Sequence, residues 1–269
     1  MWIDFRNTNE LLNLFIKNAG FKQSALLFCN YSMKTIIHKA EDRGLANHGW
    51  LKAAHSFSFA NWYNPEKVHF GLLRVLNDDI VAPGMGFDMH PHKDMEIITI
   101  PLSGALRHSD NMGNEGVITA GEVQVMSAGN GVMHSEYNAS QTEDLNLFQI
   151  WIFTDRKGHQ PRYDQKKFDE TERKDKWQLL VSPDSSDDSL WIYQNAFISI
   201  IEPDQVDSTV YKIKEEGNGV YIMLIEGESE IDGNMLQKRD AIGIWDFSGV
   251  LEIKFTKNSK LLAIEVPMN

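Results

Sequence analysis

Short apolar segments separated by turn residues fill most of the chain from residue 33 onward. Between residue 33 and about residue 155, strand-length segments are rich in Val, Ile, Phe and Leu. Turns that contain glycine separate them: Pro83-Gly84, Ser103-Gly104, Met112-Gly113, Ala120-Gly121 and Ala128-Gly129. Short strands at this spacing predict an all-β sandwich or barrel.

A second series of strand-like segments begins near Trp191. It includes V-Y-I-M-L-I-E-G, A-I-G-I-W-D-F and L-L-A-I-E-V-P, which are rich in β-branched and aromatic residues. Residues 161–190 between the two series are polar and charged, and we interpret them as a solvated linker with room for one helical turn. The pattern therefore predicts a first β domain over 33–160 and a second over 191–269.

Residues 1–32 differ from the rest of the chain. A short helix beginning near Thr8 or Asn9 would carry apolar residues on one face, namely Leu11, Leu12, Leu14 and Phe15. This extension is either an arm that packs on the barrel or the product of a start codon assigned too early. We favour the second interpretation, because Met33 opens a self-sufficient strand-like stretch.

Composition and charge narrow the class of protein. With 42% hydrophobic and 24% charged residues, the 269-residue chain has the composition of a globular protein. A net charge of −12 without clustered Lys and Arg argues against direct nucleic-acid binding, so small molecules or proteins are the expected partners. Cys29 is the single cysteine, which excludes an intramolecular disulfide. No apolar run approaches the ~20 residues that span a bilayer, and no secretory pattern opens the chain, so we expect the cytoplasm.

Two pairs of metal-ligand residues stand at strand spacing. His90 and His92 occur in G-M-G-F-D-M-H-P-H-K-D-M-E, and His134 and Glu136 occur in S-A-G-N-G-V-M-H-S-E-Y-N. Residues i and i+2 of a strand point to the same face. Two such pairs on neighbouring strands would aim three imidazoles and one carboxylate at a common centre, leaving one or two positions of an octahedral ion open.

One His-x-His pair alone would fit an ordinary surface equally well. Two same-face pairs, each introduced by a glycine-rich turn, favour a metal site. All nine histidines lie within the first 159 residues, so we expect a single site, in the first domain.

Other residues near these motifs have simpler interpretations. We expect His55, which stands among aromatic residues, to be a hydrogen-bonded structural residue. His108 follows a turn and could line the mouth of the pocket, but we favour a loop role for it. The methionines around the motifs could fill the barrel or shape an apolar substrate pocket, and we favour core packing for them, namely for Met85, Met89, Met95, Met126 and Met133.

The motifs resemble those of a known family. Gly84-x5-His90-x-His92-x3-Glu96 is similar to the first motif of the cupin superfamily, and the block from Gly121 to Asn138 is similar to the second. The block departs from the general cupin pattern, because Asn130-Gly131 lengthens the spacing before the histidine. That spacing, together with H-S-F-S-F-A-N-W-Y-N-P and H-P-H-K-D-M-E, resembles the pirin family from residue 33 to the C-terminus.

The resemblance implies a bicupin, that is, two tandem cupin-type β-barrels with a metal in the first barrel only. In pirins the ligands correspond to His90, His92, His134 and Glu136, and the ion is iron. Glu96 competes with Glu136, because most cupins take their carboxylate from that position and because Glu96 has the parity of His90 and His92 if the strand continues. We place Glu136 on the ion and Glu96 either next to the ligands without contacting the ion or hydrogen-bonded to a ligand histidine.

The resemblance also implies an activity like that of quercetin 2,3-dioxygenases, which act on flavonols or related enolisable aromatics with O2. Glu136 would then be both a ligand and the catalytic base. Fe2+ is the expected ion, although the donor set also suits Mn, Co, Ni, Cu or Zn.

A different class of function fits the same site. The chain would then be an iron-dependent redox-sensing regulatory protein that binds a protein partner without catalysis, and its acidic character favours such a partner over DNA. A cupin isomerase or a non-catalytic remnant is a third reading.

Overall fold

The computed structural model describes residues 33–247, 249–256 and 258–269, and the predictions made for residues 1–32 lie outside this part of the chain. From residue 33 onward the chain forms one compact unit. It consists of strands and two short 3-10 helices, η1 (Ala40–Asp42) and η2 (Glu170–Arg173). The all-β prediction is therefore confirmed. Within the described residues, no helix has the length and apolar character needed to cross a membrane.

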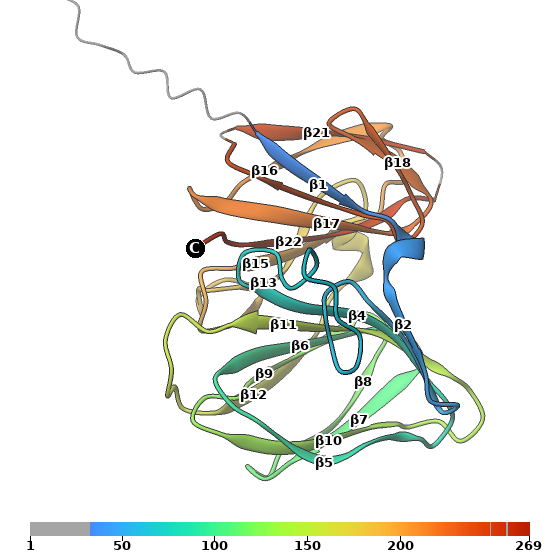
Figure 1. The fold of residues 1–269 in the computed structure, drawn as a ribbon, viewed down its shortest axis with the longest axis vertical. Helices are drawn as coiled ribbons and strands as arrows, with labels where there is room; N and C mark the ends of the chain where they lie inside the picture. The colour runs from blue at the N-terminus through green and yellow to red at the C-terminus, as the bar shows by residue number, and fades with distance from the viewer. Residues whose placement is uncertain (1–32, 248, 257) are drawn as a thin grey trace, which may run out of the picture. The chain divides into compact units, whose positions relative to one another are not determined.

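The first half of the unit is built from two sheets (Figure 1). A seven-stranded sheet has the order β12-β9-β6-β11-β4-β3-β2 and a four-stranded sheet the order β5-β10-β7-β8. Their bounds are β2 (Gly44–Asn47), β3 (Leu51–His55), β4 (Leu73–Val81), β5 (Gly86–His92), β6 (Met95–Ser103), β7 (Ala105–Asp110), β8 (Glu115–Thr119), β9 (Glu122–Ser127), β10 (Val132–Asn138), β11 (Leu145–Phe153) and β12 (Arg162–Lys167).

The second half repeats this plan. Its seven-stranded sheet has the order β1-β20-β17-β22-β15-β13-β14, and its four-stranded sheet the order β16-β21-β18-β19. Their bounds are β1 (Lys34–His38), β13 (Gln178–Ser182), β14 (Leu190–Trp191), β15 (Phe197–Ile201), β16 (Ser208–Lys212), β17 (Asn218–Glu226), β18 (Glu228–Ile231), β19 (Asn234–Gln237), β20 (Ala241–Trp245), β21 (Val250–Phe255) and β22 (Lys260–Pro267).

The long apolar strands are explained by burial on both faces. In β17, Tyr221 and Met223 belong to one apolar cluster, whereas the alternating Ile222 and Leu224 belong to another. A strand that is covered on both sides has a continuous apolar sequence, because neither of its faces contacts water. This pattern accounts for the V-Y-I-M-L-I sequence of β17.

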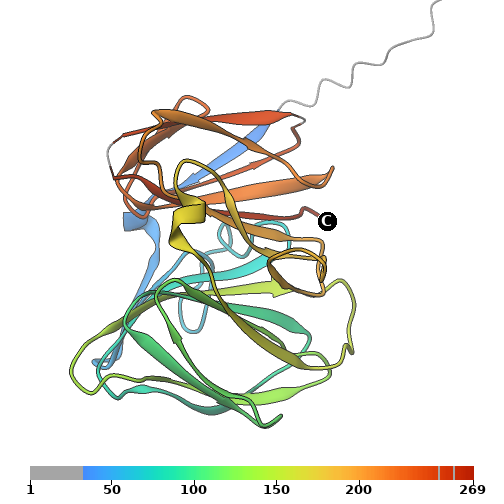
Figure 2. The ribbon, with the colours of Figure 1, turned by 180° about the vertical axis from the view of Figure 1, so that it is seen from behind.

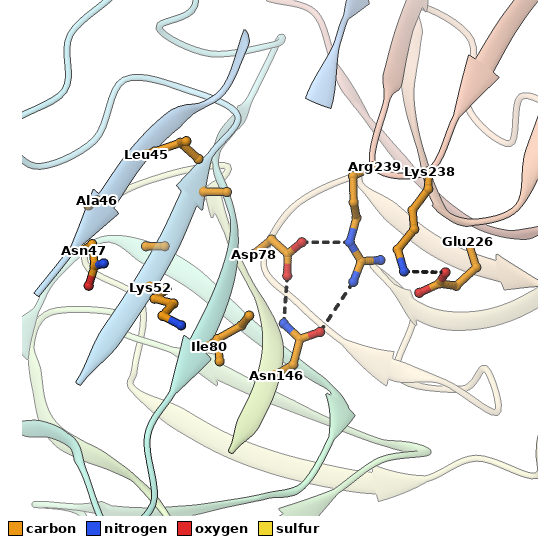
Figure 3. A pocket seen from close by; sticks show the side chains of 12 residues that line it. Leu45, Ala46, Asn47, Lys52, Asp78, Ile80, Asn146, Glu226, Lys238 and Arg239 are labelled. Atoms are coloured by element: carbon orange, nitrogen blue, oxygen red, sulfur yellow. Dashed lines mark hydrogen bonds and ion pairs between the residues drawn. The ribbon is translucent and has the colours of Figure 1, made fainter. Parts of the chain in front are cut away.

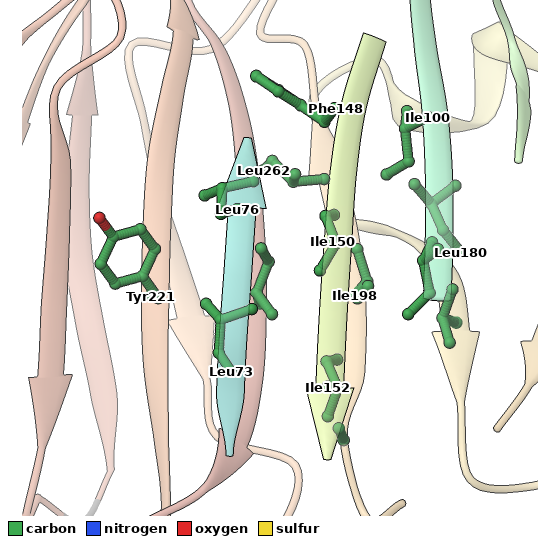
Figure 4. Packing of buried hydrophobic residues seen from close by; sticks show 14 of the residues in the cluster. Leu73, Leu76, Ile100, Phe148, Ile150, Ile152, Leu180, Ile198, Tyr221 and Leu262 are labelled. Atoms are coloured by element: carbon green, nitrogen blue, oxygen red, sulfur yellow. The ribbon is translucent and has the colours of Figure 1, made fainter. Parts of the chain in front are cut away.

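The larger apolar cluster lies between the two seven-stranded sheets. Leu76 and Ile150 from the first sheet meet Ile198, Tyr221 and Leu262 from the second (Figure 4). All five are at most 2% exposed. The outer faces of the two large sheets thus form one core, and the inner faces enclose a separate interior in each half.

Chain segments at both ends tie the halves together. Strand β1 pairs with β20, so a segment that was predicted to belong to the first domain joins the sheet of the second half. In Figure 1 the blue strand β1 lies beside the orange and red strands of that half. Near the other terminus, the Leu72 amide donates to the Pro267 carbonyl at 2.9 Å. Such long-range pairing leaves no signal in the local sequence pattern.

The charged stretch 161–190 contains regular structure. Strand β12 pairs with β9 of the first half, and β13 pairs with β15 of the second. The helix η2 lies between them on the yellow part of the chain that passes from one half to the other (Figure 2). The stretch therefore supplies strands to both sheets, and the domain limits at 160 and 190 stay a prediction.

A polar junction also joins the halves and lines a cavity of about 610 Å³ (Figure 3). The Arg239 Nε lies 2.8 Å from Asp78 Oδ2, and Asn146 donates to Asp78 Oδ1 at 2.8 Å. Lys238 is paired with Glu226 at 2.7 Å. Two cations of the second half are therefore neutralised at this junction, one of them across the boundary.

Candidate metal centre

The predicted ligands lie on two paired strands of the four-stranded sheet in the first half. His90 and His92 are on β5, and His134 and Glu136 are on β10. His134 stands directly opposite His90 in this antiparallel pair, and the register shifts between His134 and Glu136. A shift of this kind bends a strand and re-aims the side chains next to it.

A glycine allows the two strands to approach at this point. Gly86 of β5 stands opposite Tyr137, and a Cβ on Gly86 would lie 2.2 Å from the Glu136 carbonyl oxygen. A side chain at this position would push β5 away from β10. The glycine-rich stretch before His90 is therefore needed for the packing of the strands that carry the ligands.

Three imidazoles converge inside the barrel. The ring centroids are 4.8 Å apart for His90 and His92, 4.4 Å for His90 and His134, and 4.9 Å for His92 and His134. One nitrogen of each ring lies within 4.8 Å of the others. Because an imidazole nitrogen binds a transition metal at about 2.0–2.1 Å, such a group can share one ion after small adjustments.

The hydrogen bonding of the rings fits a metal. His134 is 1% exposed, and neither of its ring nitrogens has a hydrogen-bond partner among the described residues. Buried polar atoms are rarely left without partners, so these nitrogens lack a group that would satisfy them. The Nδ1 of His90 lies 2.7 Å from the Asp88 carbonyl oxygen, which leaves its Nε2 available as a ligand.

The electrostatics keep two of the rings neutral. Burial, together with the neighbouring histidines, lowers the pKa of His92 to about 4 and that of His134 to about 3. Both rings are therefore uncharged at neutral pH. A neutral imidazole is the form that binds a metal, so no proton has to leave these two groups first.

Glu136 joins His134 in a second, overlapping group. Its carboxylate is 3% exposed and lies with His108 and His134 in a set whose ligand atoms are all within 4.8 Å of one another. The structure thus brings all four predicted residues to one part of the barrel interior. His134 is common to both groups.

His108 belongs to this second group, although the sequence favoured a loop role for it over a place at the mouth of the pocket. The expected loop position is wrong, because His108 is on β7, is fully buried and stands opposite Glu136 in the β7–β10 pair. Its Nε2 lies 3.3 Å from Asp110 Oδ2, and its ring stacks on Tyr163 with centroids 4.4 Å apart. The period-two spacing of Leu106, His108 and Asp110, all of which are buried, could have indicated a strand with His108 on its inward face.

Glu96 lies apart from the histidines. It is fully buried on β6, and its Oε2 accepts a 2.6 Å hydrogen bond from Ser127 Oγ. Ile98 and Ile100, which share its parity, belong to the core between the large sheets. The expected hydrogen bond to a ligand histidine is not among those of the described residues.

The physical reason is a break in the strand. Asp94 has a φ of +49° in the turn between β5 and β6, so the parity counted from His92 does not continue to Glu96. Glu96 therefore points out of the barrel. Its burial there raises its pKa to about 7.

A surface hollow lies beside the strands that carry the histidines. A cavity of about 390 Å³ next to His92 is lined by Pro91, Val132 and Met133 among others. Core packing was expected for the nearby methionines, but Met85, Met89 and Met133 are between 41% and 48% exposed. Met126 does lie in the core.

Comparison with known proteins gives a consistent result. Residues 38–152 match the family model described as pirin, and residues 179–266 match the one described as quercetinase C-terminal cupin domain. A protein of Escherichia coli K12 named quercetin 2,3-dioxygenase is 43% identical over 234 residues, which cover 86% of this chain and 98% of the relative. A pirin-like protein of Caulobacter vibrioides is 42% identical over 223 residues, covering 82% of this chain and 95% of the relative.

A solved structure agrees in fold. The bacterial pirin YhhW from Escherichia coli, crystallised in complex with nickel(II), superimposes with a TM-score of 0.81 at 41% identity. The superposition covers 87% of this chain and 99% of that chain.

Proposed function

The chain belongs to the pirin family, and from this premise we propose that it is a metal-dependent dioxygenase acting on quercetin-like flavonols or related enolisable aromatics. The observation that carries the proposal is the convergence of His90, His92 and His134. The ring of His134 is buried, and neither of its nitrogens has a hydrogen-bond partner among the described residues. The relatives named quercetin 2,3-dioxygenase supply the substrate class.

The proposed ligands are His90, His92, His134 and Glu136, and the proposed ion is Fe2+. The nickel in the Escherichia coli relative supports a divalent ion with nitrogen and oxygen ligands but does not select iron for this chain. When bound, the ion supplies Lewis acidity, which lowers the pKa of a hydroxyl group placed next to it.

The side chains of this protein would then bind the substrate and take up its proton. Val132, which stands opposite His92 and shares the parity of His134, gives the interior beside the histidines an apolar wall suited to aromatic rings. Glu136 is also the residue proposed to receive the hydroxyl proton while it binds the ion. The Trp151 ring lies 4.9 Å from that of His92 and adds apolar surface beside the site.

The test is oxygen uptake by protein loaded anaerobically with Fe2+ and then supplied with quercetin. Uptake that needs both the ion and quercetin, and that is lost in His134→Ala together with the bound ion, is the expected result. A protein that binds one ion per chain but consumes no oxygen with a panel of phenolic substrates contradicts the proposal. That outcome would favour the regulatory reading, which a redox-dependent pull-down of a partner would then examine.

A further inference from the structure

A row of polar side chains crosses the seven-stranded sheet of the first half. Gln124 stands opposite Thr99, Thr99 stands opposite Gln149, and the pairing continues outward to Gln165 on one side and to Asn77 on the other. Directly paired residues in a sheet point to the same face. These side chains therefore face the barrel interior together, toward the sheet that carries the histidines.

Three members of the row contact Glu136. Gln149 Nε2 donates to Glu136 Oε2 at 2.9 Å, Gln124 Nε2 donates to Oε1 at 3.1 Å, and Thr99 Oγ1 donates to Oε1 at 3.2 Å. The carboxylate from β10 is thus held by donors from β6, β9 and β11. We name Thr99, Gln124 and Gln149 the carboxylate cradle.

The cradle is itself fixed by hydrogen bonds. Thr99 Oγ1 lies 3.2 Å from Gln149 Oε1 and accepts from Gln124 Nε2 at 3.4 Å. Thr99 and Gln124 are fully buried. Amides held in this way cannot rotate away without leaving a buried polar group unpaired.

The hydrogen bonds leave a defined part of the carboxylate available. A carboxylate accepts about four hydrogen bonds or metal contacts in total. In this structure two donors lie within hydrogen-bond distance of Oε1 and one within that distance of Oε2. The single Thr99 proton is shared between Glu136 Oε1 and Gln149 Oε1, both at 3.2 Å, and Oε2 is the carboxylate oxygen with fewer contacts. The neutral donors also offset the cost of placing Glu136 in the interior.

We infer that Thr99, Gln124 and Gln149 are positioning residues that hold Glu136 toward the three histidines, with Oε2 as the oxygen that has fewer contacts. The inference rests on the proposed function, because it gives the cradle its purpose at the metal site. Without the cradle, the Glu136 side chain would be free to adopt other rotamers and would reach the ion less often. Mutation of a residue that hydrogen-bonds to a metal ligand commonly weakens metal binding about 10- to 100-fold.

The test compares Gln149→Leu and Gln124→Leu with the matched control Gln165→Leu. Gln165 belongs to the same row but has no hydrogen bond to Glu136 among the described residues; its Oε1 accepts from Tyr163 at 2.7 Å. Ni(II) affinity is measured by competition with a chelator, and the ligand field is followed by the visible absorption of the Co(II)-loaded protein. Circular dichroism and the melting temperature of the metal-free proteins report whether each variant folds.

The expected result is Ni(II) binding about 10- to 100-fold weaker in Gln149→Leu and Gln124→Leu, with shifted Co(II) bands, and unchanged values in Gln165→Leu. The variant Glu136→Gln separates two failures. If Glu136→Gln weakens Ni(II) binding but folded Gln149→Leu and Gln124→Leu retain wild-type affinity and spectra, the cradle inference is wrong. If Glu136→Gln also retains both, Glu136 is not a ligand and the proposed metal site fails with it.

Discussion

The lowered pKa values of the buried histidines predict how metal binding responds to acid. At pH 5.5, a histidine with an ordinary pKa of about 6.5 is mostly protonated, and its affinity contribution falls about tenfold relative to pH 7.5. Two such histidines would together cost about 100-fold. In this protein His92 and His134 have pKa values of about 4 and about 3, so both stay neutral across this range.

We therefore expect these two residues to contribute almost nothing to the pH dependence, and the total fall in Ni(II) affinity between pH 7.5 and 5.5 to be about tenfold or less. Trp151 provides the assay, since its ring lies 4.9 Å from that of His92 and a bound paramagnetic ion should quench its fluorescence. The variant Trp151→Phe identifies the part of the signal that comes from this residue. A fall of about 100-fold or more, with the fold intact at pH 5.5, would refute the reasoning.

Three further changes have expected outcomes. Glu136→Gln should retain part of the bound metal but lose about 10²- to 10⁴-fold of the quercetin-dependent oxygen uptake, because an amide cannot accept the proton; turnover near the wild-type value would contradict the role of base. Ile150→Ala, at a fully buried position between the large sheets, should lower the free energy of unfolding by about 2–5 kcal/mol in urea titrations, against a negligible effect of Val117→Ala, which is 48% exposed. The pKa of Glu96 is about 7 in the folded state and about 4.5 in the unfolded state, so between these values the folded state binds the extra proton and the free energy of unfolding falls as pH rises. The wild type should therefore lose at most about 3 kcal/mol of stability from this group between pH 4.5 and 8, and Glu96→Gln should not show this loss. Equal pH profiles of stability for variant and wild type would disprove the prediction.

Local patterns predicted the parts of the site that depend on strand parity. His90 with His92 and His134 with Glu136 stand at spacing two, and each pair lies on a single strand as the spacing requires. The alternation of strand faces did not extend to Glu96, because the turn at Asp94 changes which residues face the barrel interior. The sequence H-P-H-K-D-M-E contains no strong signal for that turn.

Long-range pairing accounts for what the sequence did not reveal. The cradle residues are polar positions in three largely apolar strands, and only the register of β9, β6 and β11 places them in one row. His108 became part of the site through its pairing opposite Glu136. The exchange of β1 into the second sheet likewise depends on residues more than 200 positions apart, such as Lys34 and Trp245.

The central claim is that one ion is shared by three imidazoles and a carboxylate in the first barrel, and an anomalous diffraction map of crystals grown with the native metal tests it most directly. We predict a single peak about 2.0–2.2 Å from a nitrogen of His90, His92 and His134 and from Oε2 of Glu136. A peak bound by His108 in place of His90 and His92, or no peak in the first barrel of a protein that binds one ion per chain, would contradict it.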